Sequence, residues 1–338
     1  MKQVWISRHG APDVLEVREA PDPRPGPGQV RIRTAAAGVN FADILARLGL
    51  YPDAPRPPCV VGYEVAGTVD EVGPDVTFPS PGTRVLATTR FGGYSDAVVV
   101  PAAGAVPVPS GLSLESAAAL PVNYLTAWLM LVRLGNVRAG ERVLIHAAAG
   151  GVGLAAIQLC RWRGAEVIGT AGASKHERLR AAGVTHCIDY RTQDFEAEVR
   201  RLTGGRGVDI VLDAVGGASY GKSYRSLAPL GRLFVFGASS FATGKKRRVM
   251  TVLAGLLRTP RFHPLHMMSR NRGVFGVNLG HLWDRLDILG EGIAEILGLV
   301  AEGRLSPVVD RTFPFADAAR AHEYLQDRKN FGKVLLVP

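Results

Sequence analysis

The sequence predicts an α/β protein with a β-rich N-terminal part and a doubly wound parallel sheet, and three observations support this fold class. Up to about residue 120, short strand-like runs are separated by glycine and proline. From residue 142 onward, strand-like runs alternate with helix-like runs. The composition of 47% hydrophobic and 21% charged residues is typical of a folded protein, and 338 residues are enough for two domains.

The N-terminal part is expected to be mostly β-structure. Residues 28–34 alternate between apolar and polar side chains, as a half-buried strand does. Further strands are expected at 65–69 and 97–100, and one short helix near 41–48. The prolines in 21–27 predict an extended loop before the first of these strands.

The following part predicts repeated strand–helix units. The expected strands are 142–146, 166–170, 186–189, 208–212, 231–236 and 273–277. One helix is expected to end at 163, and further helices are expected near 175–182, 194–202 and 219–227. In the C-terminal tail we expect helices near 282–302 and 315–326 and a strand at 333–337. Such alternation implies a parallel sheet covered by helices on both faces.

A glycine-rich turn follows the strand expected at 142–146. Residues 147–153 read Ala-Ala-Ala-Gly-Gly-Val-Gly and open a helix, which is the dinucleotide-binding fingerprint with Ala148 at its first glycine position. Free N–H groups at such a helix start bind a pyrophosphate. The predicted phosphate-binding residues are Gly150, Gly151, Val152 and Gly153. The alternative is a tight structural turn in another α/β fold.

The residue type at the end of the second strand of such a unit decides between NAD and NADP, because an acidic residue there would bind the ribose 2′-hydroxyl of NAD. Here the strand end carries small residues and no acid, which leaves room for a 2′-phosphate that Lys175 can neutralise. Tyr190, at the end of the next strand, is placed to cover the adenosine. We therefore expect NADPH, held at this end by Thr170, Gly172, Ser174, Lys175 and Tyr190. The alternative for Lys175 is a solvated lysine in a helix's first turn.

Several motifs carry a family resemblance. Together with the turn at 147–153, the segments 37–43, 62–67 and 120–127 resemble the zinc-free quinone oxidoreductase (ζ-crystallin) branch of the medium-chain dehydrogenase/reductase superfamily. Within that branch, the segments 173–177, 183–190 and 329–338 are most similar to synaptic-vesicle membrane proteins of the vesicle amine transport type. The resemblance implies a GroES-like catalytic domain (1–121 and 282–338) and a Rossmann NADPH-binding domain (122–281).

The metal ligands of the zinc-dependent relatives have no counterpart in this sequence. Asn40 stands at the first ligand position, Tyr63 replaces the histidine, and the region near Val122 offers no ligand. Residues 88–101 contain none of the four cysteines of a structural zinc lobe. We therefore expect no metal. Without a Lewis acid, reduction of a quinone or an α,β-unsaturated carbonyl by hydride transfer is favoured over alcohol oxidation.

The resemblance also implies the remaining site residues. Asn40 and Thr126 would lie near the nicotinamide, while Tyr51 and Tyr63 would line the substrate side, which makes Asn40, Tyr51 and Tyr63 the expected catalytic residues. The further cofactor contacts are Phe236, Gly237, Ser239, Val277, Asn278 and Lys333.

Each of the three expected catalytic residues also has a structural alternative. Asn40 could cap a helix, Tyr51 could be an exposed loop aromatic, and Tyr63 could simply pack. Asp43 and Glu64 are interpreted as structural, bonded to backbone or to Arg47.

The net charge of +10 is concentrated in one block. Residues 214–283 contain eleven Lys and Arg and no Asp or Glu, which leaves 29 of the 40 basic residues against all 30 acidic residues elsewhere. Within it, 245–258 places four cations ahead of an apolar run with helical spacing. The segment 245–272 could contact an anionic membrane surface, cover the active site or form part of a subunit interface.

Two functions follow from these observations. The first is an NADPH-dependent reductase of a small quinone or enone, and the alternative is an NADPH-binding, lipid- or membrane-associated protein with weak catalysis. Nucleic-acid binding is disfavoured, because the basic block lacks interleaved aromatic residues. The resemblance implies a homodimer formed through 273–277.

The sequence also carries signals about its compartment. The three cysteines share no CxxC spacing, and no signal peptide or membrane-spanning run is visible. We therefore expect a cytoplasmic protein, with a peripheral membrane location as the alternative.

Overall fold

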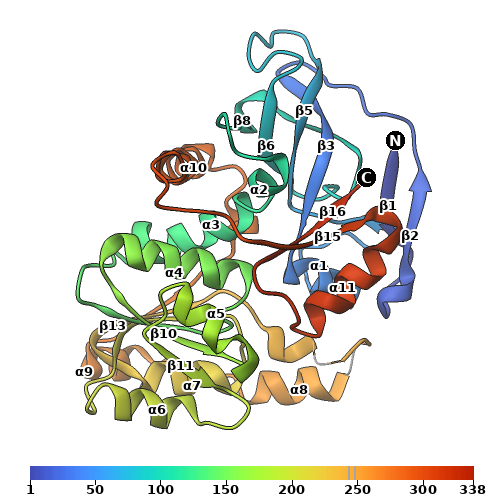
Figure 1. The fold of residues 1–338 in the computed structure, drawn as a ribbon. Coiled ribbons are helices and arrows are strands. Elements are labelled where there is room, and N and C mark those ends of the chain that lie inside the picture. The colour runs from blue at the N-terminus through green and yellow to red at the C-terminus, as the bar shows by residue number, and fades with distance from the viewer. Residues whose placement is uncertain (243, 247–248) are drawn as a thin grey trace. The chain divides into compact units, whose positions relative to one another are not determined.

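The computed structural model describes residues 1–242, 244–246 and 249–338 (Figure 1). Arg247, Arg248 and the side chain of Val249, which the sequence placed in the basic amphipathic segment, lie outside the described part. The chain divides into two compact units. Unit 1 comprises Met1–Leu125, Gly244–Arg247 and Gly280–Pro338, and unit 2 comprises Thr126–Thr243 and Arg248–Leu279.

Unit 1 is built on two antiparallel or mixed sheets. The larger has the order β15 (Val309–Pro314), β16 (Lys333–Val337), β3 (Gln29–Val39), β5 (Glu64–Val72), β6 (Arg84–Thr88) and β8 (Ala105–Pro107), with β7 (Ala97–Pro101) also paired to β3. The smaller has the order β2 (Leu15–Glu19), β1 (Lys2–Ile6) and β4 (Cys59–Val60). Figure 1 shows β16, in red, alongside the blue β3, which brings the chain's two terminal parts into one sheet.

Five helices begin in unit 1. They are α1 (Phe41–Arg47), α2 (Leu114–Ala118), α3 (Pro121–Trp128), α10 (Leu286–Ala301) and α11 (Ala318–Gln326). Helix α1 starts directly after β3, where the Asp43 carboxylate accepts a 2.7 Å hydrogen bond from the backbone N–H of Asn40. A carboxylate at the third helical position satisfies a donor that the helix itself leaves unpaired. This turn fixes where Asn40 points.

Unit 2 is a doubly wound parallel sheet, as the sequence predicts. Its order is β11 (His186–Asp189), β10 (Glu166–Ala171), β9 (Arg142–Ile145), β12 (Val208–Asp213), β13 (Leu227–Val235) and β14 (Gly273–Gly276). The helices are α4 (Gly151–Arg163), α5 (His176–Ala181), α6 (Phe195–Leu202), α7 (Ala218–Arg225), α8 (Val249–Leu257) and α9 (Pro264–Arg270). Figure 1 shows α4 on one face of the sheet, with α6 and α7 on the other. All strand pairs are parallel, so their carboxyl ends share one edge.

The predicted elements differ from the observed ones mainly in unit 1. The strand expected at 28–34 extends to Val39, and the helix expected at 282–302 spans Leu286–Ala301. The elements that were not predicted from the sequence are β1, β2, β4, β6, β8, β15, α2, α3 and α9. Within the described residues, no helix is long and apolar enough to span a bilayer.

Candidate functional site

Three strands of unit 1 bring a buried polar cluster together. Asn40 follows β3, Glu64 begins β5 and Lys333 begins β16, and these strands are neighbours in the sheet. Lys333 Nζ donates to Asn40 Oδ1 at 2.7 Å and also to Glu64 Oε1. Asn40 Nδ2 donates to Glu64 Oε1 at 2.9 Å. The Asn40 amide is therefore held from both ends by a charged pair that is almost fully buried.

Glu64 has a further partner that ties the sheet to the next helix. Its second oxygen, Oε2, accepts a 2.7 Å hydrogen bond from the backbone N–H of Val122, in the first turn of α3. The expectation that Glu64 bonds to backbone is met, whereas a bond to Arg47 is not formed. Arg47 donates instead to the Gly10 carbonyl and to Gln326 Oε1.

A second buried network surrounds Asp43. Its carboxylate accepts hydrogen bonds from the backbone N–H groups of Asn40 and Gly62 and from the Tyr94 hydroxyl. Complete burial raises the pKa of Asp43 to about 7 in spite of these donors. Tyr94 Oη also lies 3.2 Å from His322 Nε2, and burial lowers the pKa of His322 well below its usual range. Asp43 is therefore structural and bonded to backbone, which is the first of the two expected partners, and it forms no hydrogen bond with Arg47.

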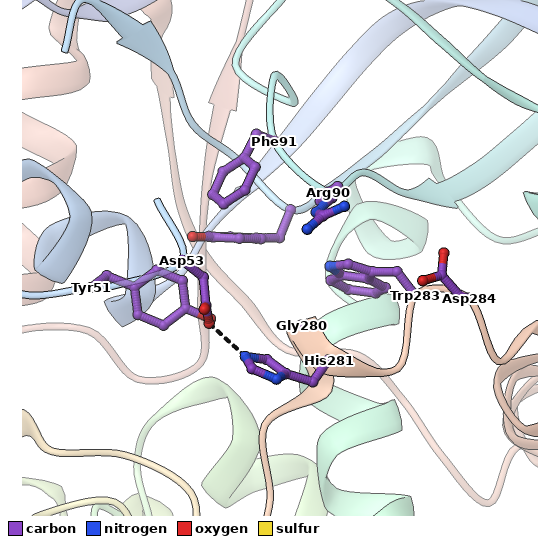
Figure 2. Close-up of a pocket in the computed structure, with 9 residues that line it drawn as sticks. Tyr51, Asp53, Arg90, Phe91, Gly280, His281, Trp283 and Asp284 are labelled. Carbon is purple, nitrogen blue, oxygen red and sulfur yellow. Dashed lines mark hydrogen bonds and ion pairs between the residues drawn. The ribbon is translucent and has the colours of Figure 1, made fainter. Parts of the chain in front are cut away.

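Tyr51 and Tyr63 line a pocket in unit 1 (Figure 2). The other lining residues are Asp53, Arg90, Phe91, Gly280, His281, Trp283 and Asp284. The Tyr63 ring is flanked by Tyr51, edge-on at 6.1 Å between centroids, and by Phe91 at 5.4 Å. Aromatic rings therefore form one part of the pocket wall, which suits a flat, conjugated molecule, and Asp53, Arg90, His281 and Asp284 form a polar part.

The Tyr63 hydroxyl is unusual among the groups at this pocket. It is buried and has no hydrogen-bond partner among the described residues. Burial raises the pKa of Tyr63 well above its usual range, with nearby Asp43 as the largest charged contributor. The phenol therefore keeps its proton and can donate a hydrogen bond to a carbonyl oxygen without a competing internal acceptor.

The glycine turn of unit 2 has the geometry that the sequence predicts. A β-carbon added at Gly153 would lie 2.5 Å from the Ala148 carbonyl oxygen, so only glycine permits this close contact between α4 and the turn. Ala148 N–H donates to the Thr170 carbonyl at 3.1 Å, which joins the turn to β10. The first N–H groups of α4 have no partners within the helix. The turn therefore fits a dinucleotide pyrophosphate at Gly150–Gly153.

The end of β10 presents cations and no carboxylate of its own. Gly172 follows the strand, and Lys175 ends the short 3-10 helix after it (Ala173–Lys175). The guanidinium of Arg191 lies here too: its Cζ would be 3.5 Å from a β-carbon at Gly172 and lies 5.9 Å from the Tyr190 ring centre. Arg191 was not predicted, because nothing in its own stretch of sequence marks it as facing β10.

The remaining predicted cofactor residues of unit 2 gather at the same edge of the sheet. Phe236 and Gly237 follow β13, and Val277 follows β14, where its N–H donates to the Val235 carbonyl. Ser239 N–H donates to the Ala214 carbonyl after β12. Thr126 lies on α3 and is buried, and Asn278 comes directly after Val277. The predicted residues thus fall into two groups, one in each unit, with Asn40, Tyr51, Tyr63 and Lys333 in unit 1.

Asn40 and Tyr63 stand where the zinc-dependent relatives have zinc ligands, and their side chains are an amide and a phenol. Asn40 is occupied by Glu64 and Lys333, and Tyr63 is a protonated hydroxyl. Within residues 1–242, 244–246 and 249–338, no group of three His, Cys, Asp or Glu side chains is arranged to hold a metal ion. These residues do not have the donor set of a catalytic zinc site.

Comparison with known proteins identifies the class. The family model for the alcohol dehydrogenase GroES-like domain matches residues 26–110, and the model described as zinc-binding dehydrogenase matches residues 182–336. The quinone oxidoreductase of Escherichia coli complexed with NADPH superimposes with a TM-score of 0.89 and 31% identity, covering 100% of both chains. The chain belongs to the medium-chain dehydrogenase/reductase superfamily of oxidoreductases, with the predicted GroES-like and Rossmann-type domains.

Two curated relatives show which members of the superfamily this chain resembles in sequence. The synaptic vesicle membrane protein VAT-1 homolog of Homo sapiens is 42% identical over 325 residues, which cover 96% of this chain and 82% of the relative. The 2-haloacrylate reductase of Burkholderia sp is 37% identical over 340 residues, covering 98% of each chain. The similarity to the vesicle amine transport type that the sequence indicated is confirmed.

Proposed function

We propose that the chain reduces quinones or α,β-unsaturated carbonyl compounds by transfer of a hydride from NADPH, without zinc. The observation that carries this proposal is the unpaired, protonated Tyr63 hydroxyl in a pocket of aromatic rings. A hydrogen bond from Tyr63 to the substrate carbonyl draws electron density toward oxygen, which makes the conjugated system a better hydride acceptor. A phenol thereby replaces the Lewis acid that alcohol chemistry would need.

The cofactor part of the proposal rests on unit 2. Gly150–Gly153 would hold the pyrophosphate, while Lys175 and Arg191 would hold the 2′-phosphate that distinguishes NADPH from NADH. When bound, the nicotinamide supplies the hydride. The relatives support this choice, since the solved quinone oxidoreductase is an NADPH complex and a curated relative is a 2-haloacrylate reductase.

Steady-state oxidation of NADPH tests the function. The substrates are a series of quinones, enones and 2-haloacrylates, with saturated ketones as the matched negative set. We expect turnover of the conjugated compounds only. In Tyr63→Phe, which keeps the ring and removes the hydroxyl, kcat/KM should fall by about a hundredfold. Absence of turnover above background with every conjugated compound would refute the reductase function.

A second candidate function, binding to an anionic lipid surface, is favoured by the exposed apolar side chains of α8 and α9. Met250 and Leu257 are 75% and 79% exposed, and Leu265 and Met268 are 67% and 69% exposed. Phe262 and Met267 instead pack on the core of unit 2. Such a run of exposed Leu and Met is uncommon on a surface that faces only water.

Some of the basic side chains of residues 214–283 already form ion pairs within the protein, which leaves only the others to bind anionic lipid. Four of these cations form ion pairs within their own unit: Lys222 with Asp194, Arg225 with Glu196, Arg232 with Glu141 and Lys245 with Glu323. In the described part of the chain, no ion pair is formed by Lys246, Arg258, Arg261 or Arg270. The electrostatic contribution to lipid binding should therefore come from this second set.

Flotation with vesicles tests the lipid function. We expect binding to vesicles that contain phosphatidylserine and little binding to vesicles of phosphatidylcholine alone. Leu256→Ser combined with Leu257→Ser, or Arg258→Gln combined with Arg261→Gln, should abolish the binding, while Lys329→Gln in unit 1 should not. If α8 instead covers a second copy of the chain, the serine variant changes the oligomeric state and leaves flotation unchanged.

The homodimer also remains a proposal. In the described residues β14 lies at the end of its sheet and pairs only with β13, and Phe275 is 37% exposed. An uncovered strand edge can pair with the same strand of a second copy. Sedimentation of the wild type and of Val274→Pro, which removes a backbone donor from this edge, tests the arrangement, since only the wild type should dimerise.

A further inference from the structure

A hydrogen-bonded histidine–aspartate pair forms part of the pocket wall. His281 Nε2 and Asp53 Oδ2 lie 2.7 Å apart, and both residues line the pocket with Tyr51 and Tyr63 (Figure 2). His281 ends a 3-10 helix (Leu279–His281), and Asp53 lies in the loop after α1. The two residues are 228 positions apart in sequence, so the fold of unit 1 creates the pair.

The geometry of the pair leaves one ring nitrogen available. Asp53 Oδ2 accepts a hydrogen bond from Nε2–H, which fixes the orientation of the imidazole ring. The contact with Asp53 uses Nε2, so Nδ1 lies outside the pair. The His281 side chain is 63% exposed, so its ring can exchange protons with water while it faces the pocket.

We propose that His281 is the general acid of the reduction, and that Asp53 is its positioning residue. This inference rests on the proposed reductase function and assigns the proton donor for it. Hydride addition to the β-carbon breaks a C–H bond of NADPH, forms a C–H bond on the substrate and moves the π-electron pair toward the carbonyl oxygen. The resulting enolate needs one proton.

The proton comes from the imidazolium form of His281. Its Nδ1–H bond breaks, and a C–H bond at the α-carbon, or an O–H bond on a quinone-derived oxygen, forms. Neutral His281 then keeps the proton on Nε2, hydrogen-bonded to Asp53, and Nδ1 regains its proton from water. NADPH is oxidised to NADP⁺ by two electrons, the substrate is reduced by the same two electrons, and charge and atoms balance.

His281 and Tyr63 have different roles: His281 transfers a proton, and Tyr63 only donates a hydrogen bond. Burial raises the pKa of Tyr63 so far that its hydroxyl can donate a hydrogen bond but cannot give up its proton near neutral pH. Histidine exchanges its proton in that range. The charged side chains that line the pocket with His281 are Asp53, Asp284 and Arg90, and the other ionisable side chains in the lining are Tyr51 and Tyr63.

The pH dependence of kcat tests the assignment. For the wild type with an enone, kcat should fall with rising pH, the direction that a catalytic acid produces. His281→Gln, which keeps a polar side chain of similar size, should lose about a hundredfold in kcat and should lose that pH limb. Asp53→Asn should lower kcat by about tenfold and move the limb to a different pH. His9→Gln, an exposed histidine of unit 1 outside the pocket, should match the wild type.

Two further measurements separate chemistry from folding. The Kd for NADPH should be unchanged in His281→Gln, and added imidazole should restore part of the activity of His281→Ala, because the site is open to water. A wild-type kcat that does not fall with rising pH, or an unchanged kcat or pH limb in His281→Gln, overturns the assignment. A wild type with no turnover overturns the reductase function as well, and so is distinguishable from failure of the proton donor alone.

Discussion

Tyr94 Oη donates a 2.9 Å hydrogen bond to Asp43 Oδ2 where neither side chain is exposed to water. The contact lowers the pKa of Asp43, but burial outweighs it, so the protonation of Asp43 is coupled to folding. Burial raises the pKa of Asp43 to about 7, whereas an unfolded aspartate titrates near 3.9. Between these pH values the folded protein binds more protons than the unfolded chain, so the free energy of unfolding falls as pH rises.

The first prediction compares the wild type with Asp43→Asn by chemical denaturation from pH 4 to pH 8. The stability of the wild type relative to the variant should fall by about 1.4 kcal/mol per pH unit, or about 4 kcal/mol over three units. His322 is present in both proteins, so its own titration cancels. A difference that stays constant with pH would show that Asp43 is ionised throughout.

The second prediction concerns the buried pair of Glu64 and Lys333. Lys333→Met leaves the Glu64 carboxylate buried without its cation, and should lower the free energy of unfolding by about 3–5 kcal/mol. Adding Glu64→Gln should restore a large part of this loss, because no unpaired charge remains. Denaturation of both single variants and the double variant measures the coupling, and simple additivity would contradict a direct interaction.

The third prediction concerns the 2′-phosphate. Lys175→Ala should raise the Kd for NADPH by about tenfold or more and change the Kd for NADH little, since a charge-assisted hydrogen bond contributes about 1.5–3 kcal/mol. Arg191→Ala should show the same selectivity. Lys329→Ala, a surface lysine paired with Asp327, is the control. An equal loss for both nucleotides would mean that Lys175 acts on the fold of the loop.

Unit 2 could be predicted from sequence almost element by element, and unit 1 could not. In β12 every residue from Val208 to Asp213 is buried, and the uninterrupted apolar run Ile210–Leu212 marks the strand in the sequence. In unit 1, three of the six residues of β15 are exposed, and β8 has only three residues. Such strands are defined by their partners in the sheet, and a local pattern does not contain that information.

The residues of the candidate site also divide into those that could be predicted from the sequence and those that could not. Gly153 could be predicted because the dinucleotide turn is local and needs glycine at a fixed spacing. Arg90, His281 and Trp283 could not, since the fold brings them to the pocket from segments almost 200 residues apart. Arg191 was missed for a related reason, because two parallel strands must be adjacent before its side chain meets Gly172.

The fourth prediction concerns metal content. The purified protein should contain no stoichiometric zinc, and a chelator should leave its melting temperature unchanged, because Asn40 and Tyr63 provide no zinc ligands. Metal analysis by mass spectrometry after dialysis measures the first quantity. One zinc ion per chain would show that other residues form a site and would refute the zinc-independent mechanism.

The fifth prediction uses two helical glycines with opposite surroundings. In Gly153→Ala the new methyl group would lie 2.5 Å from the Ala148 oxygen and 2.6 Å from the Ala147 oxygen, both backbone atoms, so α4 must move away from the turn. The free energy of unfolding should fall by about 1–3 kcal/mol, and the Kd for NADPH should rise because the N–H groups of the turn are displaced.

Gly298→Ala in α10 is the matched control, since nothing lies within 4 Å of its added β-carbon. Alanine is the better helix former, so this variant should be more stable by up to about 1 kcal/mol and should bind NADPH as the wild type does. Denaturation and nucleotide fluorescence titration on the three proteins measure both quantities, and a Gly153→Ala protein with unchanged NADPH affinity would show that the turn does not hold the pyrophosphate.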